Sequence, residues 1–399
     1  MNRHQARGAD LPAPGQAAAE HSERLRQLIY DDIGANGGRI NFARFMELAL
    51  YAQGLGYYVA GARKFGEAGD FVTAPEISPL FSRALARQVK AVLESLGQAD
   101  VLEAGAGLGT MARDILLELE AQDCLPGNYF IIELSPDLRQ RQRQTIEAGA
   151  PHLLDRVMWL DALPQSGFRG VVLGNEVLDA MPVHVVEMTA SGLAERYVVA
   201  TDTGFAWQTG ELSDPALAQR YQRLQQEVGE DIFCKGYTTE INLAADAWVT
   251  SLADMLEAGL ILLIDYGFPQ AEYYFEERTG GTIMCHYRHR SHPDPLILVG
   301  LQDITAHVDF TAVAHAGANA GLDVAGYTAQ APFLLGNGLT ELAQLTPEGD
   351  VRQHLDVTQQ IKKLTMPSEM GELFKVIALG RELDIPLMGF MFQDRRNRL

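Results

Sequence analysis

The sequence predicts a doubly wound α/β fold with a seven-stranded, mostly parallel sheet. From Asp100 onward, short apolar runs alternate with amphipathic helical patterns, as in sheets whose two faces are covered by helices. The first of these runs leads directly into a glycine-rich turn, residues 105–109, that opens a helix. With 399 residues, of which 47% are hydrophobic, the chain also has enough apolar material for a large core.

Five short apolar segments are the expected parallel strands. They are residues 101–103, 129–133, 157–160, 170–174 and 260–265. We expect helices over residues 111–122 and 136–148 to make crossovers between them. Two later segments, residues 322–327 and 374–379, are expected to close the sheet as an antiparallel pair.

The region before the sheet is predicted to be helical. Residues 1–21 are rich in Ala, Pro, Gly and Gln, a composition typical of a mobile tail. The spacing of apolar residues then predicts three helices, one capped by Ser22, one from Asn41 to Gly54 and one from Leu80 to Gly97. Between the last two, residues 61–79 are expected to form a long loop, a kind of segment that is often functional.

Two intervals between the expected strands are too long for single crossovers. The first contains three strand patterns of a small antiparallel meander and a helix over residues 214–229, and the second is rich in Tyr, His and Pro. Both leave the sheet at carboxyl ends of strands, where open α/β sheets bind ligands, so we expect lids or partner-binding surfaces. The predicted division is a tail (1–21), a helical region (22–98), an α/β core (99–182, 259–267 and 311–399) and two insertions (183–258 and 268–310).

The composition argues against several classes of partner and compartment. The 32 Lys and Arg residues and 52 Asp and Glu residues give a formal net charge of −20, which repels phosphate backbones and anionic lipid. Cys124, Cys234 and Cys285 form no C-x-x-C pair, so we expect no disulfide framework and no thiolate zinc site. No apolar run approaches 18 residues, and the start lacks a signal-peptide centre. We therefore expect a cytoplasmic protein that binds neither nucleic acid nor membrane.

The strongest functional pattern is E-A-G-A-G-L-G-T, at the end of the first expected strand. Glycines permit positive φ and close backbone approach to a ligand. Their spacing is G-x-G-x-G, whereas dinucleotide sites have G-x-G-x-x-G. The preceding acid would repel a pyrophosphate but suits a ligand with an ammonium or sulfonium group, which favours S-adenosylmethionine over NAD. The cofactor-binding candidates here are Glu103, Gly105, Ala106, Gly107, Gly109 and Thr110.

Two further acids follow neighbouring strands. Glu133 ends the second strand, 24 residues after Gly109, at a position where an acid accepts hydrogen bonds from ribose hydroxyls. NAD would use the same acid, so Glu133 alone does not separate the two ligands. Asp161, followed by Ala162, comes after the third strand, where an Asp can meet an adenine amino group. For each acid the alternative is a solvated loop carboxylate.

The fourth strand is followed by N-E-V-L-D, in which Asn175, Glu176 and Asp179 are the catalytic candidates. If the strand stops at Asn175, the two acids occupy one tight turn and can grip a guanidinium through charge-assisted hydrogen bonds. Arginine is protonated in water, so methylating it requires a group that orients the nitrogen and accepts its proton. Carboxylates do both. The alternative is that Glu176 and Asp179 cap a helix N-terminus.

Together these segments resemble the MidA family. The motifs that carry the resemblance are E-A-G-A-G-L-G-T, F-I-I-E-L-S-P, G-N-E-V-L-D-A-M-P-V, L-I-D-Y-G and D-I-T-A-H-V-D-F. It extends upstream to residues 69–79 and downstream to residues 321–335, and so covers residues 29–381. The family usually has G-P-G-x-G-T in the first motif. Ala106 replaces the proline here, a change that we expect to leave ligand binding intact.

The resemblance implies a class I, Rossmann-like methyltransferase. Its cofactor would be S-adenosyl-L-methionine, its product S-adenosyl-L-homocysteine, and its acceptor an arginine on a partner protein. The family includes a mitochondrial-matrix arginine methyltransferase that acts in respiratory complex I assembly, which makes a complex I subunit a candidate acceptor. The resemblance also implies that the loop with Asp70, Thr73 and Glu76 covers the cofactor and that the insertions form a substrate-facing lobe.

Other polar residues lie at strand ends or in the second insertion. Asp265 and Tyr266 end the fifth strand and are candidates for the far wall of the pocket. His307 and Asp309 share a short segment with Asp303, where an Asp/His pair can relay a proton. Three histidines are spaced by three residues, but no acid or thiolate pattern surrounds them, so we expect no metal site. They are His286, His289 and His292.

The leading hypothesis is a methyltransferase that uses S-adenosylmethionine and favours a protein arginine as acceptor. One alternative is an assembly chaperone that binds S-adenosylmethionine but mainly holds a partner subunit. Another is a small-molecule methyltransferase, because the sequence sets no limit on the width of the acceptor pocket. An NAD oxidoreductase is disfavoured by the glycine spacing and Glu103. An exposed apolar face on the insertions would support a homodimer.

Overall fold

The computed structural model describes residues 11–60, 72–344 and 351–399. They form two compact units. The first comprises residues 11–60, 178–245 and 270–307, and the second comprises residues 72–177, 246–269 and the described residues from 308 onward. The predicted helical region therefore contributes to both units. Asp70 and most of the predicted loop at residues 61–79 lie outside the described residues.

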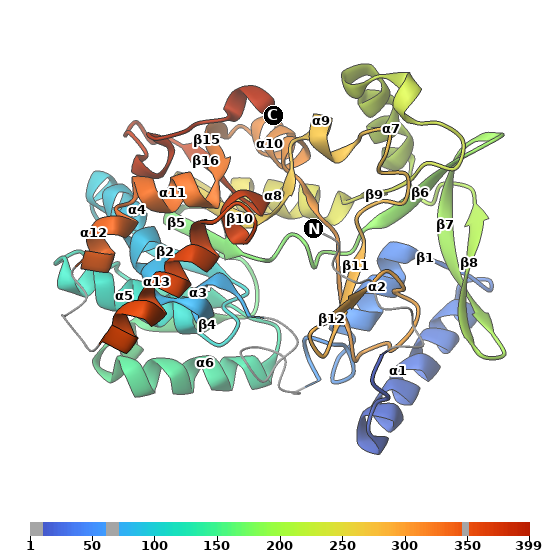
Figure 1. Cartoon of the computed structure of the whole chain (residues 1–399), viewed down its shortest axis with the longest axis horizontal. Coiled ribbons are helices and arrows are strands. Elements are labelled where there is room, and N and C mark those ends of the chain that lie inside the picture. Colours follow the sequence, from blue (N-terminus) through green and yellow to red (C-terminus); the bar gives the residue numbers. More distant parts are fainter. Residues whose placement is uncertain (1–10, 61–71, 345–350) are drawn as a thin grey trace. The chain divides into compact units, whose positions relative to one another are not determined.

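The second unit is built on a sheet whose main path holds seven strands in the order β15-β16-β10-β5-β2-β3-β4 (Figure 1). They are β2 (Asp100–Ala104), β3 (Tyr129–Ile132), β4 (Val157–Leu160), β5 (Phe168–Asn175), β10 (Leu256–Phe268), β15 (Asp323–Ala329) and β16 (Phe374–Arg381). The path from β4 to β10 is parallel, whereas β16 runs antiparallel to both β10 and β15. A short strand, β14 (Val308–Asp309), pairs with the end of β10. The predicted sheet and its closing antiparallel pair are confirmed.

Helices connect these strands and bury apolar faces against them. The crossover helices are α5 (Thr110–Ala121), between β2 and β3, and α6 (Pro136–Gly149), which the 3₁₀ helix η2 (Pro151–Arg156) joins to β4. Helix α4 (Pro79–Leu96) is capped by the Ser78 hydroxyl and ends at Gly97, which has φ 74°. The other helical segments are α3 (Ala74–Ile77), α8 (Leu243–Met255), α10 (Phe310–Asn319), α11 (Gln330–Gly336), α12 (Leu339–Gln344), α13 (Val351–Thr365), α14 (Met370–Leu373), η4 (Met388–Phe390) and η5 (Arg396–Arg398). Val89, Ile115, Val171 and Leu262 belong to the resulting core.

The first unit contains two antiparallel sheets. The larger has the order β1-β7-β6-β9, with β8 also paired to β7. Its strands are β1 (Ile40–Asn41), β6 (His184–Thr189), β7 (Gly192–Thr201), β8 (Gly204–Gly210) and β9 (Thr238–Ile241). The smaller, β12-β11-β13, consists of β11 (Met284–Tyr287), β12 (Arg290–His292) and β13 (Asp303–Thr305). The meander predicted in the first insertion is thus confirmed as β6, β7 and β8, and α7 (Pro215–Val228) follows it with Asp214 as its cap. Two short segments, η3 (Glu230–Ile232) and α9 (Gln270–Tyr273), complete the unit.

The N-terminal helix begins earlier than predicted. Helix α1 spans Gln16–Ala35, with Gly15 as its N-cap residue, so the assignment of Ser22 as the cap is wrong. Ser22 instead lies on the buried face of the helix, where its hydroxyl donates to the Val299 carbonyl at 2.8 Å. Residues 17–19 are all alanine, the residue with the highest helix propensity. The expectation of a tail up to residue 21 overlooked that propensity.

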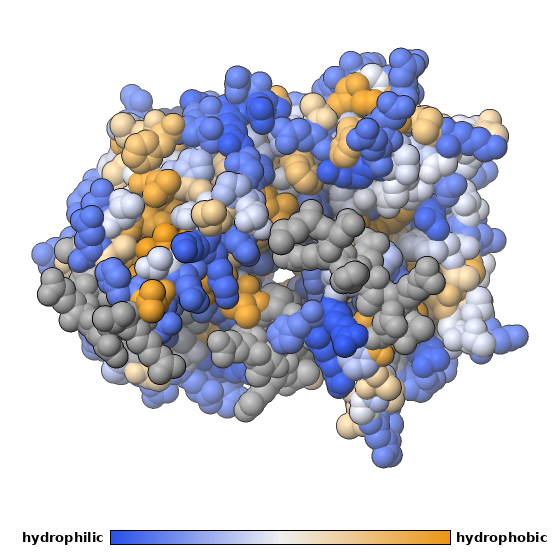
Figure 2. Space-filling view, in the orientation of Figure 1, coloured by the Kyte–Doolittle hydropathy of each residue, from blue (hydrophilic) through white to orange (hydrophobic). Residues whose placement is uncertain are grey.

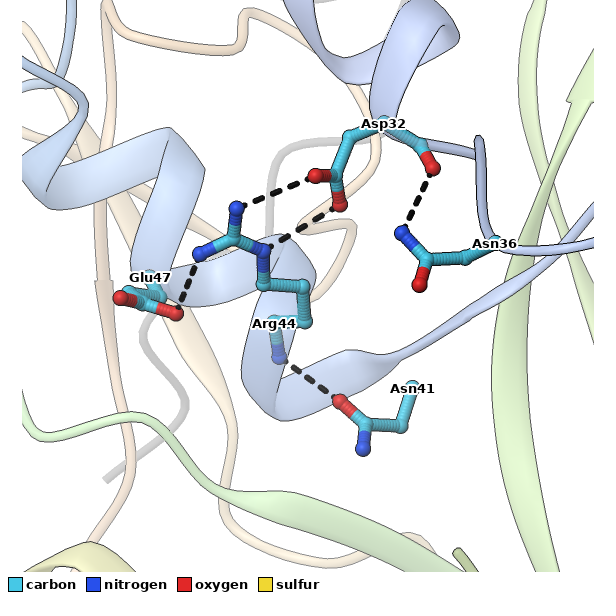
Figure 3. Close-up of polar contacts among 5 residues, drawn as sticks. All are labelled: Asp32, Asn36, Asn41, Arg44 and Glu47. Carbon is cyan, nitrogen blue, oxygen red and sulfur yellow. Dashed lines mark hydrogen bonds and ion pairs between the residues drawn. The ribbon is translucent and has the colours of Figure 1, made fainter. Parts of the chain in front are cut away.

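Helices α1 and α2 (Phe42–Tyr51) are joined by an arginine ion pair (Figure 3). Asn41, where a helix was predicted to start, is the N-cap residue of α2 and accepts from the Arg44 N–H at 2.8 Å. The Arg44 guanidinium donates to both carboxylate oxygens of Asp32, at 3.0 and 3.2 Å, and to Glu47 at 2.9 Å. These hydrogen bonds to acids raise the pKa of Arg44. A bidentate pair of this kind fixes orientation as well as distance.

Most of the surface seen in Figure 2 is hydrophilic, with small separate hydrophobic patches, in keeping with the net charge of −20. The most exposed large apolar side chains among the described residues are Met391 and Phe392. No helix in the described ranges combines the length and the apolar character needed to cross a membrane.

Candidate functional site

The glycine-rich turn lies at the carboxyl end of β2, as predicted. β2 ends at Ala104 and α5 starts at Thr110. Gly105, Gly107 and Gly109 all have positive φ, at 66°, 52° and 80°, a conformation that residues with a Cβ rarely adopt. The Gly105 N–H donates to the Ile132 carbonyl at 3.1 Å, which ties the turn to the end of β3.

The three glycines have different surroundings. A Cβ on Gly109 would lie 2.9 Å from the Cα of Gln142, so this glycine allows α6 to approach the turn. A Cβ on Gly105 would lie 3.2 Å from Val177. A Cβ on Gly107 would meet no atom of the described residues within 4 Å. Within that part of the chain, the backbone at Gly107 therefore has open space beside it, as a turn that admits a ligand requires.

Glu103 is fully buried beneath this turn. Its carboxylate accepts a hydrogen bond of 2.6 Å from the Tyr129 hydroxyl on β3. Burial raises the pKa of Glu103 to about 7, the Tyr129 hydrogen bond opposes that rise, and the charge of Glu133 adds to it. Near neutral pH, Glu103 is therefore poised between its protonated and ionised forms.

Glu133 directly follows β3 and is 8% exposed. The Ser135 N–H donates to its Oε1 and the Gln142 amide donates to its Oε2, both at 2.9 Å. Burial raises the pKa of Glu133, while these two hydrogen bonds oppose that effect. The carboxylate is thus held in one orientation at the strand end where the sequence predicted a ribose contact.

Gln142 is a site residue that the sequence reasoning missed. It lies on α6, is 0% exposed, and contacts the turn, Glu133 and β4 at once. The signal was in the helical spacing, because Leu138, Gln142 and Ile146 follow one another at intervals of four and all three are buried. A glutamine in the middle of an apolar stripe needs hydrogen-bond partners inside the protein.

Asp161 and Ala162 follow β4 and are both exposed. The Asp161 carboxylate pairs with Arg139 at 2.8 Å, and its side chain is 94% exposed. Arg139 also donates to the carbonyls of Glu133 and Leu160, both at 2.7 Å, and so connects the ends of β3 and β4. The predicted contact of Asp161 with adenine stays a prediction.

The strand before the catalytic candidates ends at Asn175, one residue beyond the expected range of 170–174, so the condition set for a turn at Glu176 is met. Glu176 has φ 53°, although it is not a glycine. Its N–H donates to the Ile264 carbonyl at 2.9 Å, and the Asn175 amide donates to its Oε1 at 3.1 Å. No helix begins between Asn175 and β6, a fully described stretch, so the helix-capping interpretation is wrong. Asp179, which belongs to the first unit, is 5% exposed, and its carbonyl accepts from the Ala306 N–H at 2.9 Å.

The candidates on β10 and β14 lie in the second unit. Asp265 is fully buried on β10, and the ring of Tyr266 packs against Phe374 with a centroid separation of 5.5 Å. Asp309 caps α10 by accepting from the Ala312 N–H at 3.1 Å, a structural role that the sequence analysis did not assign. At the start of the second unit in the sequence, Thr73 is the N-cap residue of α3, and Glu76 lies within that helix.

The remaining candidates lie in the first unit. The backbone N–H of His307 donates to Thr282 Oγ1 at 3.0 Å, and Asp303 accepts from the Tyr58 hydroxyl at 2.8 Å. His286 and His292 lie on the paired strands β11 and β12, with His289 between these strands. In the part of the chain that the structure describes, no group of three His, Cys, Asp or Glu side chains is arranged to hold a metal ion.

Comparisons with known proteins indicate the family and the fold of the chain. Residues 84–328 match the model of a family described as putative S-adenosyl-L-methionine-dependent methyltransferases. A likely methyl transferase from Burkholderia thailandensis, whose crystal structure contains S-adenosyl-homocysteine, is 46% identical, with a TM-score of 0.92 over 98% of this chain and 100% of that chain.

Curated relatives include mitochondrial proteins named protein arginine methyltransferase NDUFAF7. The Drosophila melanogaster homolog is 29% identical, over 95% of this chain and 91% of its own. The Homo sapiens protein is 27% identical, over 89% and 82% respectively.

Proposed function

The chain belongs to the MidA-like family of putative S-adenosyl-L-methionine-dependent methyltransferases, and from this premise we propose that it methylates an arginine side chain of a partner protein. The family and the class I fold make S-adenosyl-L-methionine the cofactor and methyl transfer the reaction. The choice of arginine is supported by the names of the mitochondrial relatives. The finding that most supports it within the molecule is the carboxylate of Glu176, which follows β5 on a backbone with φ 53°.

The residues present fit the cofactor. Among the described residues, nothing fills the space beside the Gly107 backbone, and Glu133 offers a buried carboxylate beside the same turn. We assign the glycine turn, Glu133 and Asp161 to cofactor binding, with the segment from Thr73 to Glu76 as part of its cover. Asp265, Tyr266, His307 and Asp309 remain candidates for the acceptor side.

The chemistry proposed for Glu176 and Asp179 follows from the charge of arginine. S-adenosyl-L-methionine supplies a methyl carbon bonded to a positive sulfonium. A guanidinium nitrogen forms the new bond to this carbon, the C–S electron pair stays on sulfur, and the nitrogen loses a proton. Carboxylates near the acceptor hold the guanidinium by charge-assisted hydrogen bonds and receive that proton.

The first experiment is calorimetry of the purified protein with S-adenosyl-L-methionine, S-adenosyl-L-homocysteine and NADH. We expect the first two to bind and NADH not to bind. The protein is then incubated with methyl-labelled cofactor and an extract of its source organism, with respiratory complex I subunits as the first purified acceptors. Methylarginine in a labelled protein supports the proposal. Label in a small molecule would contradict it in favour of a small-molecule methyltransferase.

The remaining proposals concern partners and location. The insertions at residues 183–258 and 268–310 are proposed as the substrate lobe, since they carry every strand of the two antiparallel sheets of the first unit except β1. A cytoplasmic location and a homodimer stay predictions. Size-exclusion chromatography with light scattering tests the homodimer, and a monomer at micromolar concentration would rule it out.

A further inference from the structure

The Gln142 amide joins three elements of the second unit. Its nitrogen donates to the Gly107 carbonyl at 3.0 Å and to Glu133 Oε2 at 2.9 Å. Its oxygen accepts from the Trp159 ring nitrogen at 2.9 Å. A side-chain amide has two N–H donors and one oxygen acceptor. Every part of the Gln142 amide is therefore engaged, in a position with no exposure to water.

Trp159 determines the orientation of the Gln142 side-chain amide. An indole N–H donates and cannot accept, so the Gln142 oxygen must face β4 and the NH₂ group must face the glycine turn and Glu133. The reversed amide would place its NH₂ against the indole N–H and its oxygen against a carboxylate and a carbonyl. One tryptophan thus determines the donors that reach the candidate cofactor site.

The orientation of Glu133 follows from this arrangement. The Ser135 N–H and the Gln142 amide each occupy one lone pair on a different oxygen of the carboxylate. The backbone N–H of Leu134 also hydrogen-bonds to this carboxylate. A carboxylate has about four acceptor positions, so one remains for a ribose hydroxyl, which is the group that an acid at the end of this strand meets.

We propose that Gln142 is a positioning residue for the nucleoside part of the cofactor, because its amide fixes the Gly107 peptide and the Glu133 carboxylate relative to each other. The inference rests on the cofactor half of the proposed function and does not depend on the acceptor. Gln142 touches the two groups that would meet the nucleoside, and it acts through them.

The test measures binding of S-adenosyl-L-homocysteine, and of its 2′-deoxy analogue, to the full chain by calorimetry. We expect Gln142→Ala to weaken S-adenosyl-L-homocysteine binding about 10- to 100-fold, the range for a lost hydrogen bond to a charged group. Removing the 2′-hydroxyl should then cost the wild type several times more affinity than it costs Gln142→Ala. Equal costs in both proteins, or an affinity of Gln142→Ala within twofold of wild type, would overturn the proposal.

Gln142→Glu keeps the size of the side chain and adds a readout that a structural role would not give. At pH 8 the introduced carboxylate faces Glu133 and repels it, so we expect the weakest binding there. At pH 6 the two carboxyl groups share a proton, the hydrogen bond returns, and affinity recovers at least threefold relative to wild type at the same pH. A ratio to wild type that does not change between pH 6 and pH 8 would count against the proposal.

Two controls separate this effect from loss of the fold. Gln144 is exposed on the same helix, so Gln144→Glu adds the same charge nearby and should leave binding within twofold of wild type. Trp159→Phe removes the N–H that orients the amide, together with part of the ring, and it should weaken binding less than Gln142→Ala. A wild-type protein that binds S-adenosyl-L-homocysteine but methylates no arginine would refute the arginine acceptor and leave this inference standing. A wild type that does not bind would refute both.

Discussion

Glu133 and Glu176 each follow the carboxyl end of a parallel strand, but the backbone around them is built differently. Near Glu133, the described residues with positive φ are the three glycines of the turn, and hydrogen bonds from Ser135, Gln142 and the Leu134 backbone hold the carboxylate. At the end of β5, Glu176 itself has φ 53°. A non-glycine residue in that conformation costs of order 1–3 kcal/mol and persists only where its surroundings hold it.

The difference is consistent with the proposed roles, cofactor binding for Glu133 and proton acceptance for Glu176. The β3 end is a relaxed, prearranged acceptor of hydrogen bonds, as suits a cofactor that binds and leaves in every cycle. At the end of β5, the positive φ of Glu176 lowers the stability of the fold and holds its carboxylate in a direction that a relaxed backbone would not give. Substitutions should therefore affect binding at the first end and turnover at the second.

The largest expected effect is on turnover. The double substitution Glu176→Ala and Asp179→Ala removes both proposed proton acceptors, so we expect methylation to fall at least ~100-fold, the lower end for general-base catalysis. Affinity for S-adenosyl-L-homocysteine should stay within about threefold of wild type. An assembly chaperone would keep its partner-binding function with both changes, and full methylation by the double variant would remove the distinction between the two strand ends.

The next effect is on cofactor binding. Gly107→Val fills the open space beside the turn, and we expect it to weaken S-adenosyl-L-methionine binding by at least ~100-fold, or about 2.8 kcal/mol. The fold should remain, with a loss of about 1–2 kcal/mol from a side chain at positive φ. Calorimetry measures the affinity and thermal melting measures the stability. Unchanged affinity would contradict the assignment of the turn to cofactor binding.

Gly109→Ala is the matched control in the same turn. Its Cβ would lie 2.9 Å from the Gln142 Cα, so we expect it to lower the free energy of unfolding by about 1–3 kcal/mol as an overpacked contact. For Gly109→Ala we therefore expect a larger loss of stability than of cofactor affinity, whereas for Gly107→Val we expect the reverse.

A third effect depends on pH. The folded state holds the pKa of Glu103 at about 7, above the ordinary value of 4.5, so the unfolded chain releases this proton at lower pH than the folded protein does. Stability therefore falls as pH rises from about 4.5 to 7, and levels off above that. Glu103→Gln keeps the side chain neutral, and we expect it to raise the free energy of unfolding at pH 8 by about 1–3 kcal/mol. Denaturant melts at pH 5 and pH 8 check this, and the gain should vanish at the lower pH.

The smallest effect concerns the strain itself. Glu176→Gly removes the Cβ at φ 53°, so we expect the free energy of unfolding to rise by about 1 kcal/mol while methylation is lost. Asp123→Gly, at φ 52° in the turn after α5, should stabilise the protein by a similar amount with activity intact. A stabilised and fully active Glu176→Gly would show that the strain has no part in catalysis.

The parallel sheet was predictable because its signals are local. Each strand from β2 to β5 is a short apolar run followed by a turn. The spacing of the glycines is enough to identify the turn at Gly107. The expected end of β5, at residue 174, lies one residue before the observed end at Asn175. The sequence could not reveal the positive φ of Glu176, because nothing in the side chain of glutamate favours that conformation.

Contacts distant in sequence were harder to predict. Strand β1 has two residues and pairs with β7 more than 150 positions away. It is too short to show the alternation of apolar and polar residues that predicts a strand. The early start of α1 was missed because an alanine-rich segment was assigned by composition and not by helix propensity. Gln142 was missed because a buried polar residue becomes conspicuous only once its partners on β3 and β4 are known.

The interleaved chain path of the first unit has a consequence during synthesis. The inner face of α1 carries Leu25, Ile29 and Ile33, which share a core with Val299 and Ile304. At 5–20 residues per second, the ribosome takes roughly 15 to 55 s to make the intervening chain. The nascent protein must therefore carry this helix for that time with part of its apolar face lacking its packing partners. We expect holdase chaperones to bind this helix, and ribosome-bound chains halted before residue 290 to be recovered with such a chaperone far more often than chains halted after residue 360.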